Sequence, residues 1–552
     1  MKRLTSLITL ILIALTSAMA QPIAVSQAAK SVFTLTTFKK DGSILASSHG
    51  AFISADGTAI SPWKPFVGAD HAVVIDNKGK RYDVSCIVGA NELYDMAKFC
   101  VDGKTVGAAF AQKPATTTSQ TWKVNYTVGK AAGKQMKIQK VETFMDKYPY
   151  YILSSQIEDT DLGCPLVDAA GNLLGLLQRS GDECHATAAR FAADMQVSGL
   201  TATDPVLHQT SIRIALPDNE KDATVALMLA AQNDSARYMA TINEFIKKFP
   251  LNPDGYITRA QVEQRYNHCA EAAKDMETAV DKSTNKDGAH FSYAKLIYNH
   301  ELYKTSDKDY ADWSLDKAIA ETQNAYRINP QPLYKHLEAQ IRYTKGEYKE
   351  ACDMFLGLTS TALRNPELFY EAAQCKMQLK ADDKEILQML DSAVAICKTP
   401  ASQGYAIYYI ARATQLDKMG MYRKALQDYN KYDTLRLGRV NAQFFYTREQ
   451  CAMKCRLYQQ ALDDINLALR LAPQEPLFYA EKANVQLRVA QYYEAIATAT
   501  HCLSIDANNP DAYLILGLAQ IQTGQKKEGK QSLEKAKELG NAQAQSFIDK
   551  FK

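Results

Sequence analysis

The last third of the chain repeats itself every 34 residues, and this period limits the folds open to it. Ala461, Ala495 and Gly529 are spaced at this interval, and an aromatic column follows the same spacing at Phe445, Tyr479 and Tyr513. A fixed period of this length indicates stacked supersecondary units, each of which buries its apolar face against its neighbours. The pattern therefore predicts an all-α solenoid in which small residues allow close helix crossings.

The repeat resembles the tetratricopeptide repeat (TPR), with an aromatic residue early in each unit and small residues at the crossings. The last unit carries Gly517 and Gly529 at the expected helix contact and Gly524 at the turn between the helices. Looser units precede it, so we predict a TPR domain over residues 223–552 with eight or nine helical pairs. The alternative is an unrelated α-solenoid or helical bundle.

The first part of the chain has a different pattern, typical of β structure. Residues 21–200 are predicted to form one domain, and residues 201–222, which include Pro217, are predicted to form a linker. Short β-branched and aromatic runs separated by turn residues favour a sandwich or barrel. The runs lie at 31–38, 50–54, 72–75, 82–88, 96–101, 122–128, 136–144, 150–154 and 173–178.

Three segments of this part resemble trypsin-like serine proteases. Residues 159–175 are similar to the nucleophile loop G-N-S-G-G-P-L-V and the strand that follows it, residues 50–61 to a strand pair, and residues 91–99 to the strand that carries the catalytic aspartate. The resemblance implies an all-β double barrel followed by the TPR solenoid, a multidomain chain. It also implies an ancestral hydrolase site.

The positions of the catalytic triad are degenerate in this sequence. By the resemblance, Lys64 occupies the histidine position, Asp95 the aspartate position and Leu162 the nucleophile position. A hydrocarbon side chain cannot attack a carbonyl, and an ordinary lysine is protonated at neutral pH. Pro65 disfavours a helical conformation at Lys64, where the resemblance implies a short helical turn, so we expect the local geometry to differ from that of active enzymes. Asp95 is interpreted as a structural remnant that pairs with Lys64.

Eleven cysteines leave room for disulfides or for a substitute nucleophile. Cys86 and Cys100 flank residues 91–94 almost symmetrically, which predicts that they face each other on a hairpin and pair. A second disulfide is predicted between Cys164 and Cys184, as is common in secreted chains. The alternative is a thiolate–imidazole pair of Cys164 with His185, which would make a cysteine hydrolase.

Residues 1–20 have the features of a secretory signal, namely Lys2 and Arg3, an apolar run and an Ala-Met-Ala end. Removing them reduces the net charge from +3 to +1, which gives no electrostatic reason to expect nucleic acid as a partner. We expect a periplasmic or secreted protein of a Gram-negative-type envelope, with no integral membrane segment after cleavage. No cofactor and no metal site are predicted.

The concave face of a TPR array binds peptides or proteins, and the resemblance places four residues there: Tyr446, Gln450, Asn484 and Arg488. His336, Gln340 and Tyr343 occupy similar places in an earlier unit. The sequence therefore predicts a non-enzymatic interaction scaffold, a pseudoprotease by its site chemistry. Two alternatives remain open, an active envelope protease with an unrecognised site and a periplasmic chaperone or assembly factor.

Overall fold

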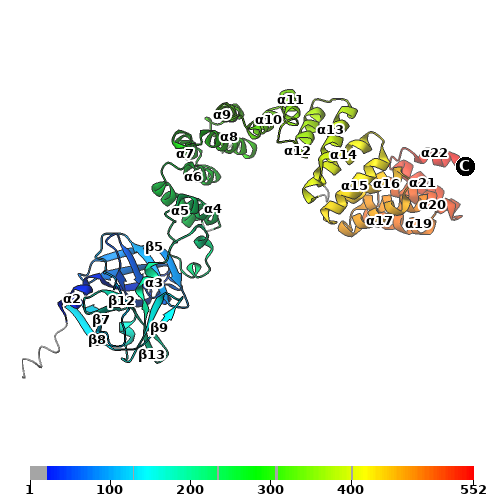
Figure 1. The fold of residues 1–552 in the computed structure, drawn as a ribbon. Helices are drawn as coiled ribbons and strands as arrows, with labels where there is room; N and C mark the ends of the chain where they lie inside the picture. The colour runs from blue at the N-terminus through cyan, green and yellow to red at the C-terminus, as the bar shows by residue number, and fades with distance from the viewer. Residues whose placement is uncertain (1–21, 128–129, 233–234, 305–308, 399–401, 552) are drawn as a thin grey trace, which may run out of the picture. The chain divides into compact units, whose positions relative to one another are not determined.

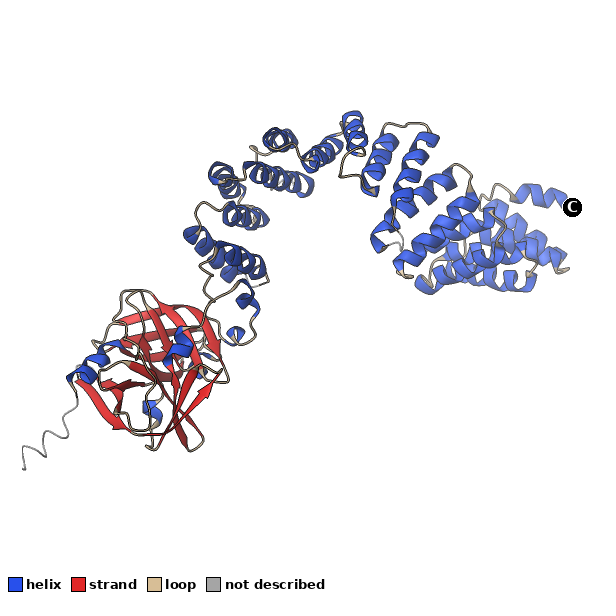
Figure 2. Ribbon diagram, viewed as in Figure 1, coloured by secondary structure: helices blue, strands red, loops and turns tan. Residues whose placement is uncertain are grey.

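The computed structural model describes residues 22–127, 130–232, 235–304, 309–398 and 402–551. Strands occupy the first part of the chain, and helices follow them to the end (Figure 2). The chain divides into two compact units, which end at Thr284 and Lys552. The predicted signal segment, residues 1–20, lies outside the described residues. No helix in the described ranges is long and apolar enough to cross a bilayer.

The first six strands close into a barrel in the order β1-β2-β3-β6-β5-β4, with every neighbouring pair antiparallel. Its interior is filled by aromatic rings, among them Phe33, Phe52 and Phe99, none more than 1% exposed. Such rings bury large areas and fix the barrel. The strands are β1 (Val32–Phe38), β2 (Ile44–Phe52), β3 (Thr58–Ser61), β4 (His71–Asp76), β5 (Arg81–Asn91) and β6 (Met96–Val101).

The next seven strands form an antiparallel sheet in the order β8-β7-β11-β12-β13-β10-β9, packed over a core that contains Leu166, Leu177 and Tyr151. The prediction of a second closed barrel is not confirmed for the described residues, because this sheet runs between two end strands. The strands are β7 (Thr121–Thr127), β8 (Lys130–Met136), β9 (Ile138–Phe144), β10 (Tyr148–Leu153), β11 (Pro165–Asp168), β12 (Leu173–Ser180) and β13 (Glu183–Ala188).

The segment predicted as a linker packs against the first barrel. Leu207 and Ile212 are buried in the barrel core, and the indole N–H of Trp63 donates to Gln209 Oε1 at 3.3 Å. Ile214 also forms a parallel bridge with Ile87 of β5. Residues 207–214 are therefore part of the folded unit, because their apolar side chains complete a core that the strands alone leave open.

Helices α4 to α21 follow as nine consecutive pairs in the described chain (Figure 1). Helices α16, α18 and α20 begin 34 residues apart, as do α17, α19 and α21, so the period in the sequence is a period in the structure. The helices are α4 (Glu220–Ala230), α5 (Ser235–Lys248), α6 (Pro253–Arg265), α7 (Cys269–Lys282), α8 (Lys286–Tyr303), α9 (Leu315–Ile328), α10 (Pro332–Lys345), α11 (Tyr348–Leu358), α12 (Pro366–Gln378), α13 (Asp383–Ile396), α14 (Ala406–Lys418), α15 (Tyr422–Arg436), α16 (Ala442–Lys454), α17 (Tyr458–Leu471), α18 (Pro476–Arg488), α19 (Tyr492–Ile505), α20 (Pro510–Gln522), α21 (Lys526–Glu538) and α22 (Ala544–Lys550).

Two glycines set the distance between α20 and α21, as the sequence predicts. A Cβ on Gly517 would lie 2.8 Å from the backbone oxygen of Gly529, and a Cβ on Gly529 would lie 2.8 Å from that of Gly517. Neither position has room for a larger residue, because the obstacle is backbone. Gly524 turns the chain between the two helices with a φ of +89°, which side chains disfavour.

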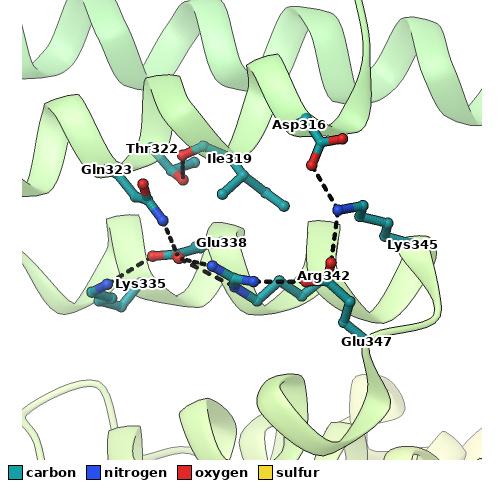
Figure 3. Close-up of polar contacts among 9 residues, drawn as sticks. All are labelled: Asp316, Ile319, Thr322, Gln323, Lys335, Glu338, Arg342, Lys345 and Glu347. Carbon is teal, nitrogen blue, oxygen red and sulfur yellow. Dashed lines mark hydrogen bonds and ion pairs between the residues drawn. The ribbon is translucent and has the colours of Figure 1, made fainter.

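Polar networks also join the helices of the second unit. Figure 3 shows the carboxylate of Glu338 on α10, which receives hydrogen bonds from Lys335, Arg342 and, on α9, Gln323. Arg342 also donates to Glu347, just before α11. Glu338 is only 2% exposed, and its three donors satisfy the charge that burial would otherwise penalise. This network holds α9, α10 and α11 together.

Candidate functional site

Asp95 lies in the turn between β5 and β6, where its carboxylate supports a helical turn. Its Oδ1 atom accepts the backbone N–H groups of Trp63 at 2.9 Å and Lys64 at 2.7 Å. These are the first amides of a 3₁₀ turn, η2 (Lys64–Phe66). The carboxylate therefore acts as a cap for amides that the turn itself cannot satisfy.

The expectation that Pro65 keeps Lys64 out of a helical conformation is wrong. The turn begins at Lys64, with Pro65 as its second residue, because a proline is tolerated where the backbone N–H has no partner within the turn. The two acceptor bonds from Asp95 outweigh the steric bias of the proline. Lys64 Nζ lies 4.0 Å from Asp95 Oδ2, with the lysine side chain 76% exposed, so the ion pair adds little to stability.

A cleft of about 410 Å³ opens beside this turn. Strands β9, β10, β12 and β13 supply most of its wall, and its lining includes Lys64, Asp95, Phe144, Tyr150, Gln178 and His185. Charges of both signs stand at the cleft, since Glu92, Glu142 and Arg179 also line it. A cavity with aromatic walls and a few polar groups is the form that ligand sites commonly take.

His185, on β13, is the imidazole of this cleft. Its Nε2 atom lies 3.1 Å from Gln178 Oε1, which also accepts the hydroxyl of Thr187 at 2.8 Å. The ring stacks on Tyr150 with centroids 4.7 Å apart, and Nδ1 has no hydrogen-bond partner. Burial lowers the pKa of His185, with a smaller opposing effect from Glu183. The imidazole therefore contacts an amide rather than a nucleophile.

Leu162 lies on a loop whose backbone amides are already engaged. The N–H of Leu162 donates to Asp159 O at 3.3 Å, Gly163 to Leu177 O at 2.8 Å and Cys164 to Asp161 O at 3.0 Å. An oxyanion hole needs amides that are free to meet a developing negative charge. The Leu162 side chain packs against the core of the second sheet. The loop thus offers neither a hydroxyl nor a free amide at these three residues.

The strand beside this loop carries His49, which donates its backbone N–H to Leu162 O at 3.0 Å. A Cβ on Gly163 would lie 2.1 Å from the His49 oxygen, and Gly163 has a φ of +80°. Only glycine fits this approach. Burial lowers the pKa of His49, and Asp161 opposes that effect. The structure thus places His49 against the loop of Leu162.

Sequence reasoning missed Lys123, which forms a nearly buried ion pair with Asp161. The two side chains are 14% and 11% exposed, and they join β7 to the residue before Leu162. Asp161 also accepts the backbone N–H of Glu158 at 3.2 Å. This ion pair holds the loop in the conformation in which its backbone amides are hydrogen-bonded. No local signal in the sequence indicates this contact, because the partners are 38 residues apart.

All four cysteines of the predicted disulfides are free thiols. Cys86 and Cys100 do face each other across β5 and β6, as the hairpin prediction requires. Cys184 instead hydrogen-bonds to Gln156 Oε1 at 3.7 Å. Cys164 is fully buried, and burial raises the pKa of its thiol far above the usual range. A buried thiol that keeps its proton is a poor nucleophile, so the Cys164–His185 alternative has no support.

Among the predicted peptide-binding residues, Tyr446 and Gln450 lie on α16, and Asn484 and Arg488 lie on α18. The ring of Tyr446 contacts Phe478 on α18, with centroids 5.6 Å apart. Asn484 Nδ2 donates to Glu481 Oε2 at 3.3 Å, and Arg488 is exposed. The structure thus brings residues of two neighbouring units together through their first helices.

The sequence did not identify two carboxylates beside these residues. Glu449 is fully buried, its Oε2 accepts Gln450 Nε2 at 2.7 Å, and its Oε1 has no partner. Burial, and then the charge of Glu481, raises the pKa of Glu449 to about 8. Glu449 stands where the next two repeats have the small residues Ala483 and Gly517. This departure from the repeat pattern could have identified Glu449 from the sequence.

The earlier residues His336 and Gln340, on α10, both contact Glu371 on α12. His336 Nε2 lies 2.6 Å from Glu371 Oε2, and Gln340 Nε2 lies 2.7 Å from Oε1. Burial opposes protonation of His336, but Glu371 raises its pKa overall. Contacts between the first helices of successive helical pairs therefore occur at α10–α12 and at α16–α18.

The described residues contain no group of three or more His, Cys, Asp or Glu side chains placed to hold a metal ion.

Comparison with solved structures finds proteases. The chain is similar to the active form of the Rv3671c protease from M. tuberculosis, with 18% identity over 36% of this chain and 90% of that chain and a TM-score of 0.28. It is also similar to the serine endoprotease from Yersinia pestis, with 17% identity over 32% of this chain and 67% of that chain and a TM-score of 0.28. No protein-family model matches the chain.

Proposed function

We propose that this protein is an interaction scaffold of the cell envelope or the secreted space, in which a catalytically inactive trypsin-like domain and a TPR array each bind a protein or peptide. One observation carries the proposal. At the position where hydrolysis needs a hydroxyl and a free amide, Leu162 supplies a hydrocarbon side chain, and its N–H is bonded to Asp159.

The retained cleft supports binding rather than chemistry. Gln178 contacts the Nε2 atom of His185, and Asp95 caps the turn at Lys64, so these polar groups contact the surrounding structure rather than a nucleophile. General base catalysis requires the base to reach the proton it removes. The cleft still offers about 410 Å³ with the rings of Phe144 and Tyr150 in its wall, which suits a side chain of a bound segment.

The second binding surface is the row of first helices in the repeat array. Tyr446, Gln450, Asn484 and Arg488 supply an aromatic ring, two amides and a guanidinium from neighbouring units. Such groups bind extended peptides through backbone and side-chain hydrogen bonds. The predicted signal at residues 1–20 supports the location of this activity outside the cytoplasm.

The catalytic part of the proposal is tested with the purified mature chain. We expect no casein turnover and no labelling by a fluorophosphonate probe above a heat-denatured blank. Labelling of a residue between 22 and 200 would defeat the proposal and favour an active protease. A trypsin sample run in parallel shows that both assays detect activity.

The binding part is tested by affinity capture from the envelope fraction of the source organism. We expect partners retained by the wild-type chain to be lost with Asn484→Ala combined with Arg488→Ala, and kept with the control Glu494→Ala on α19. Equal capture by all three chains would refute a role for this face. General suppression of client aggregation, independent of these residues, would favour the chaperone alternative.

A further inference from the structure

The first barrel carries a pair of opposed thiols. Cys86 on β5 and Cys100 on β6 are direct partners in the antiparallel register. Opposed residues in such ladders have Cα atoms about 4.5–5.5 Å apart, within the range of about 4.4–6.8 Å that a disulfide requires. The two thiols are close enough for each to change the pKa of the other. A disulfide between them therefore needs little movement of the backbone.

The two thiols differ in exposure and in acidity. Cys86 is 5% exposed, whereas Cys100 is half-buried. The hydrogen bond from Cys86 lowers the pKa of Cys100 to about 7, although burial and Asp56 oppose this effect; Lys98 on the same strand also favours the thiolate. The same contact, together with burial, raises the pKa of Cys86. Cys100 is thus the more acidic thiol of the pair and the one that forms the thiolate first.

A cavity of about 710 Å³ gives access to the pair. Its lining includes both cysteines, Lys98, Thr58 and Met195. Lys98 Nζ is held in place by the backbone oxygens of Ala193 at 2.7 Å and Met195 at 2.9 Å. Asp56, Asp218, Asp222 and Glu244 also line the cavity, so its charge is mixed. Cys100 is half-buried and opens to this cavity near a fixed lysine, so it is accessible to a reagent, as a reactive cysteine must be.

We propose that Cys86 and Cys100 form a thiol–disulfide exchange site that takes a small or protein-borne disulfide as its oxidant. The Cys100 thiolate attacks one sulfur of that disulfide, which forms a mixed disulfide and releases the first thiolate. Cys86 then loses its proton and attacks the Cys100 sulfur, which forms the Cys86–Cys100 disulfide and releases the second thiolate. Two cysteine thiols are oxidised, one disulfide is reduced to two thiols, and the protons of the pair pass to the released thiolates.

The site does not depend on the proposed scaffold function, since neither the Leu162 loop nor the repeat face takes part. It extends the prediction of a Cys86–Cys100 disulfide by assigning an order of reaction to the two cysteines. Cys164, fully buried and with a raised pKa, is the matched unreactive thiol of the same unit.

The test uses the full chain, reduced with dithiothreitol, freed of it and treated with glutathione disulfide, and then trapped and mapped by peptide mass spectrometry. We expect a Cys86–Cys100 disulfide in the wild type and a glutathione mixed disulfide on Cys100 in Cys86→Ala. In Cys100→Ser, the adduct on Cys86 forms at least about tenfold more slowly. Dithiothreitol without denaturant reverses each product.

A second measurement needs no variant. The rate of iodoacetamide alkylation of the reduced wild type, followed against pH, is expected to rise at Cys100 with a midpoint near the pKa of about 7, while Cys164 stays unmodified. Adducts that favour Cys86, or a pair that stays reduced in glutathione disulfide while alkylation at Cys100 matches Cys164, would overturn the proposal.

Discussion

The guanidinium of Arg448 holds the carboxylate of Asp464 through two parallel hydrogen bonds, Nε to Oδ2 at 3.0 Å and Nη2 to Oδ1 at 2.7 Å. The same two-bond contact, again between residues sixteen apart, joins Arg259 to Asp275 and Arg412 to Asp428. In each case an arginine on the first helix of a pair binds an aspartate on the second. The planar guanidinium of arginine suits this geometry. The helical array therefore repeats a bidentate Arg–Asp ion pair as well as an apolar pattern.

Breaking the Arg448–Asp464 ion pair is expected to destabilise the helical pair α16 and α17 strongly. Asp464 is 1% exposed, so Arg448→Met leaves a buried carboxylate without its partner, at a cost of about 3–5 kcal/mol in the free energy of unfolding. Urea unfolding, with hydrogen exchange of α16 and α17, measures the loss. The exposed Arg470→Met is the control, and Arg448→Met with Asp464→Leu is expected to recover most of the stability. An unchanged single variant would contradict this.

Glu449 gives the stability of the array a pH dependence. Its folded pKa, raised from 4.5 to about 8 by burial and by Glu481, means that the folded chain holds a proton that the unfolded chain releases. The contribution of Glu449 to the free energy of unfolding is therefore fully present below pH 4.5 and is lost as the pH rises through about 8. The shift corresponds to roughly 5 kcal/mol as an upper limit.

We expect Glu449→Gln to flatten this decline, so that the variant is more stable than the wild type at pH 9 and similar to it at pH 4.5. Thermal unfolding from pH 4 to pH 9 measures the difference. Glu481→Gln is expected to move the decline to lower pH and to make it smaller, because it removes a charge that raises the pKa of Glu449. Glu494→Gln on α19 is the control, and identical profiles for Glu449→Gln and wild type would refute the assignment.

Loss of the Glu481 charge lowers the folded pKa of Glu449, which brings it closer to the unfolded value. The decline therefore ends at a lower pH and is smaller than in the wild type. A Glu481→Gln profile displaced upward would contradict the coupling between these two carboxylates.

Asp95 is expected to matter for the fold and not for a reaction. Asp95→Ala removes the acceptor of the Trp63 and Lys64 amides and places alanine at a φ of +48°, at a cost of about 1–3 kcal/mol. Asp95→Asn keeps an acceptor oxygen and tolerates this φ, so it should cost less than about 1 kcal/mol. Thermal unfolding compares the two, and an equal loss in both variants would show that the charge itself is needed.

The close crossing of α20 and α21 predicts opposite outcomes for two glycines. Gly517→Ala pushes a methyl group against the Gly529 backbone and should cost about 1–3 kcal/mol. Gly357→Ala, in α11 with nothing within 4 Å of its added Cβ, should stabilise by up to about 1 kcal/mol. The difference in unfolding midpoint between the two variants measures the effect. Stabilisation by Gly517→Ala would mean that the helices separate at little cost.

Replacing the side chains of the degenerate triad is not expected to restore hydrolysis. In Leu162→Ser combined with Lys64→His, the N–H of residue 162 still faces Asp159 O, and those of Gly163 and Cys164 are still bonded. An oxyanion would find no free donor among these three amides. Casein and fluorophosphonate assays should remain at background, with Leu162→Ala as the matched control. Turnover above that control would show that the loop reorganises readily.

The sequence predicted those features that depend on local patterns. The 34-residue period, the Gly517–Gly529 crossing and the opposition of Cys86 and Cys100 all follow from spacing, and the structure confirms each. The Asp95–Lys64 contact is also present. The predicted apolar runs leave out β3, β11 and β13 and reach β8 only at Met136. In β13, Cys, His, Ala and Thr give no strong apolar alternation.

The remaining features depend on contacts that spacing does not encode. Lys123 meets Asp161 only because β7 pairs with β11, and His185 meets Gln178 only through the register of β12 and β13. The retained turn at Lys64 was mispredicted because a local rule for Pro65 was applied without the long-range bonds from Asp95. The Lys123–Asp161 and Lys64–Asp95 contacts join residues 38 and 31 positions apart, which local spacing does not encode.

The equal spacing of α16, α18 and α20 has a consequence for how this chain can change over generations. Each of these helices begins at a residue preceded by asparagine or glutamate, at Ala442, Pro476 and Pro510. An in-frame duplication or deletion between two such points joins equivalent ends and recreates an existing junction. Whole helical pairs can therefore be gained or lost by recombination without a new type of helix–helix interface. The length of the helical array is thus easier to change than the closed barrel at the amino terminus.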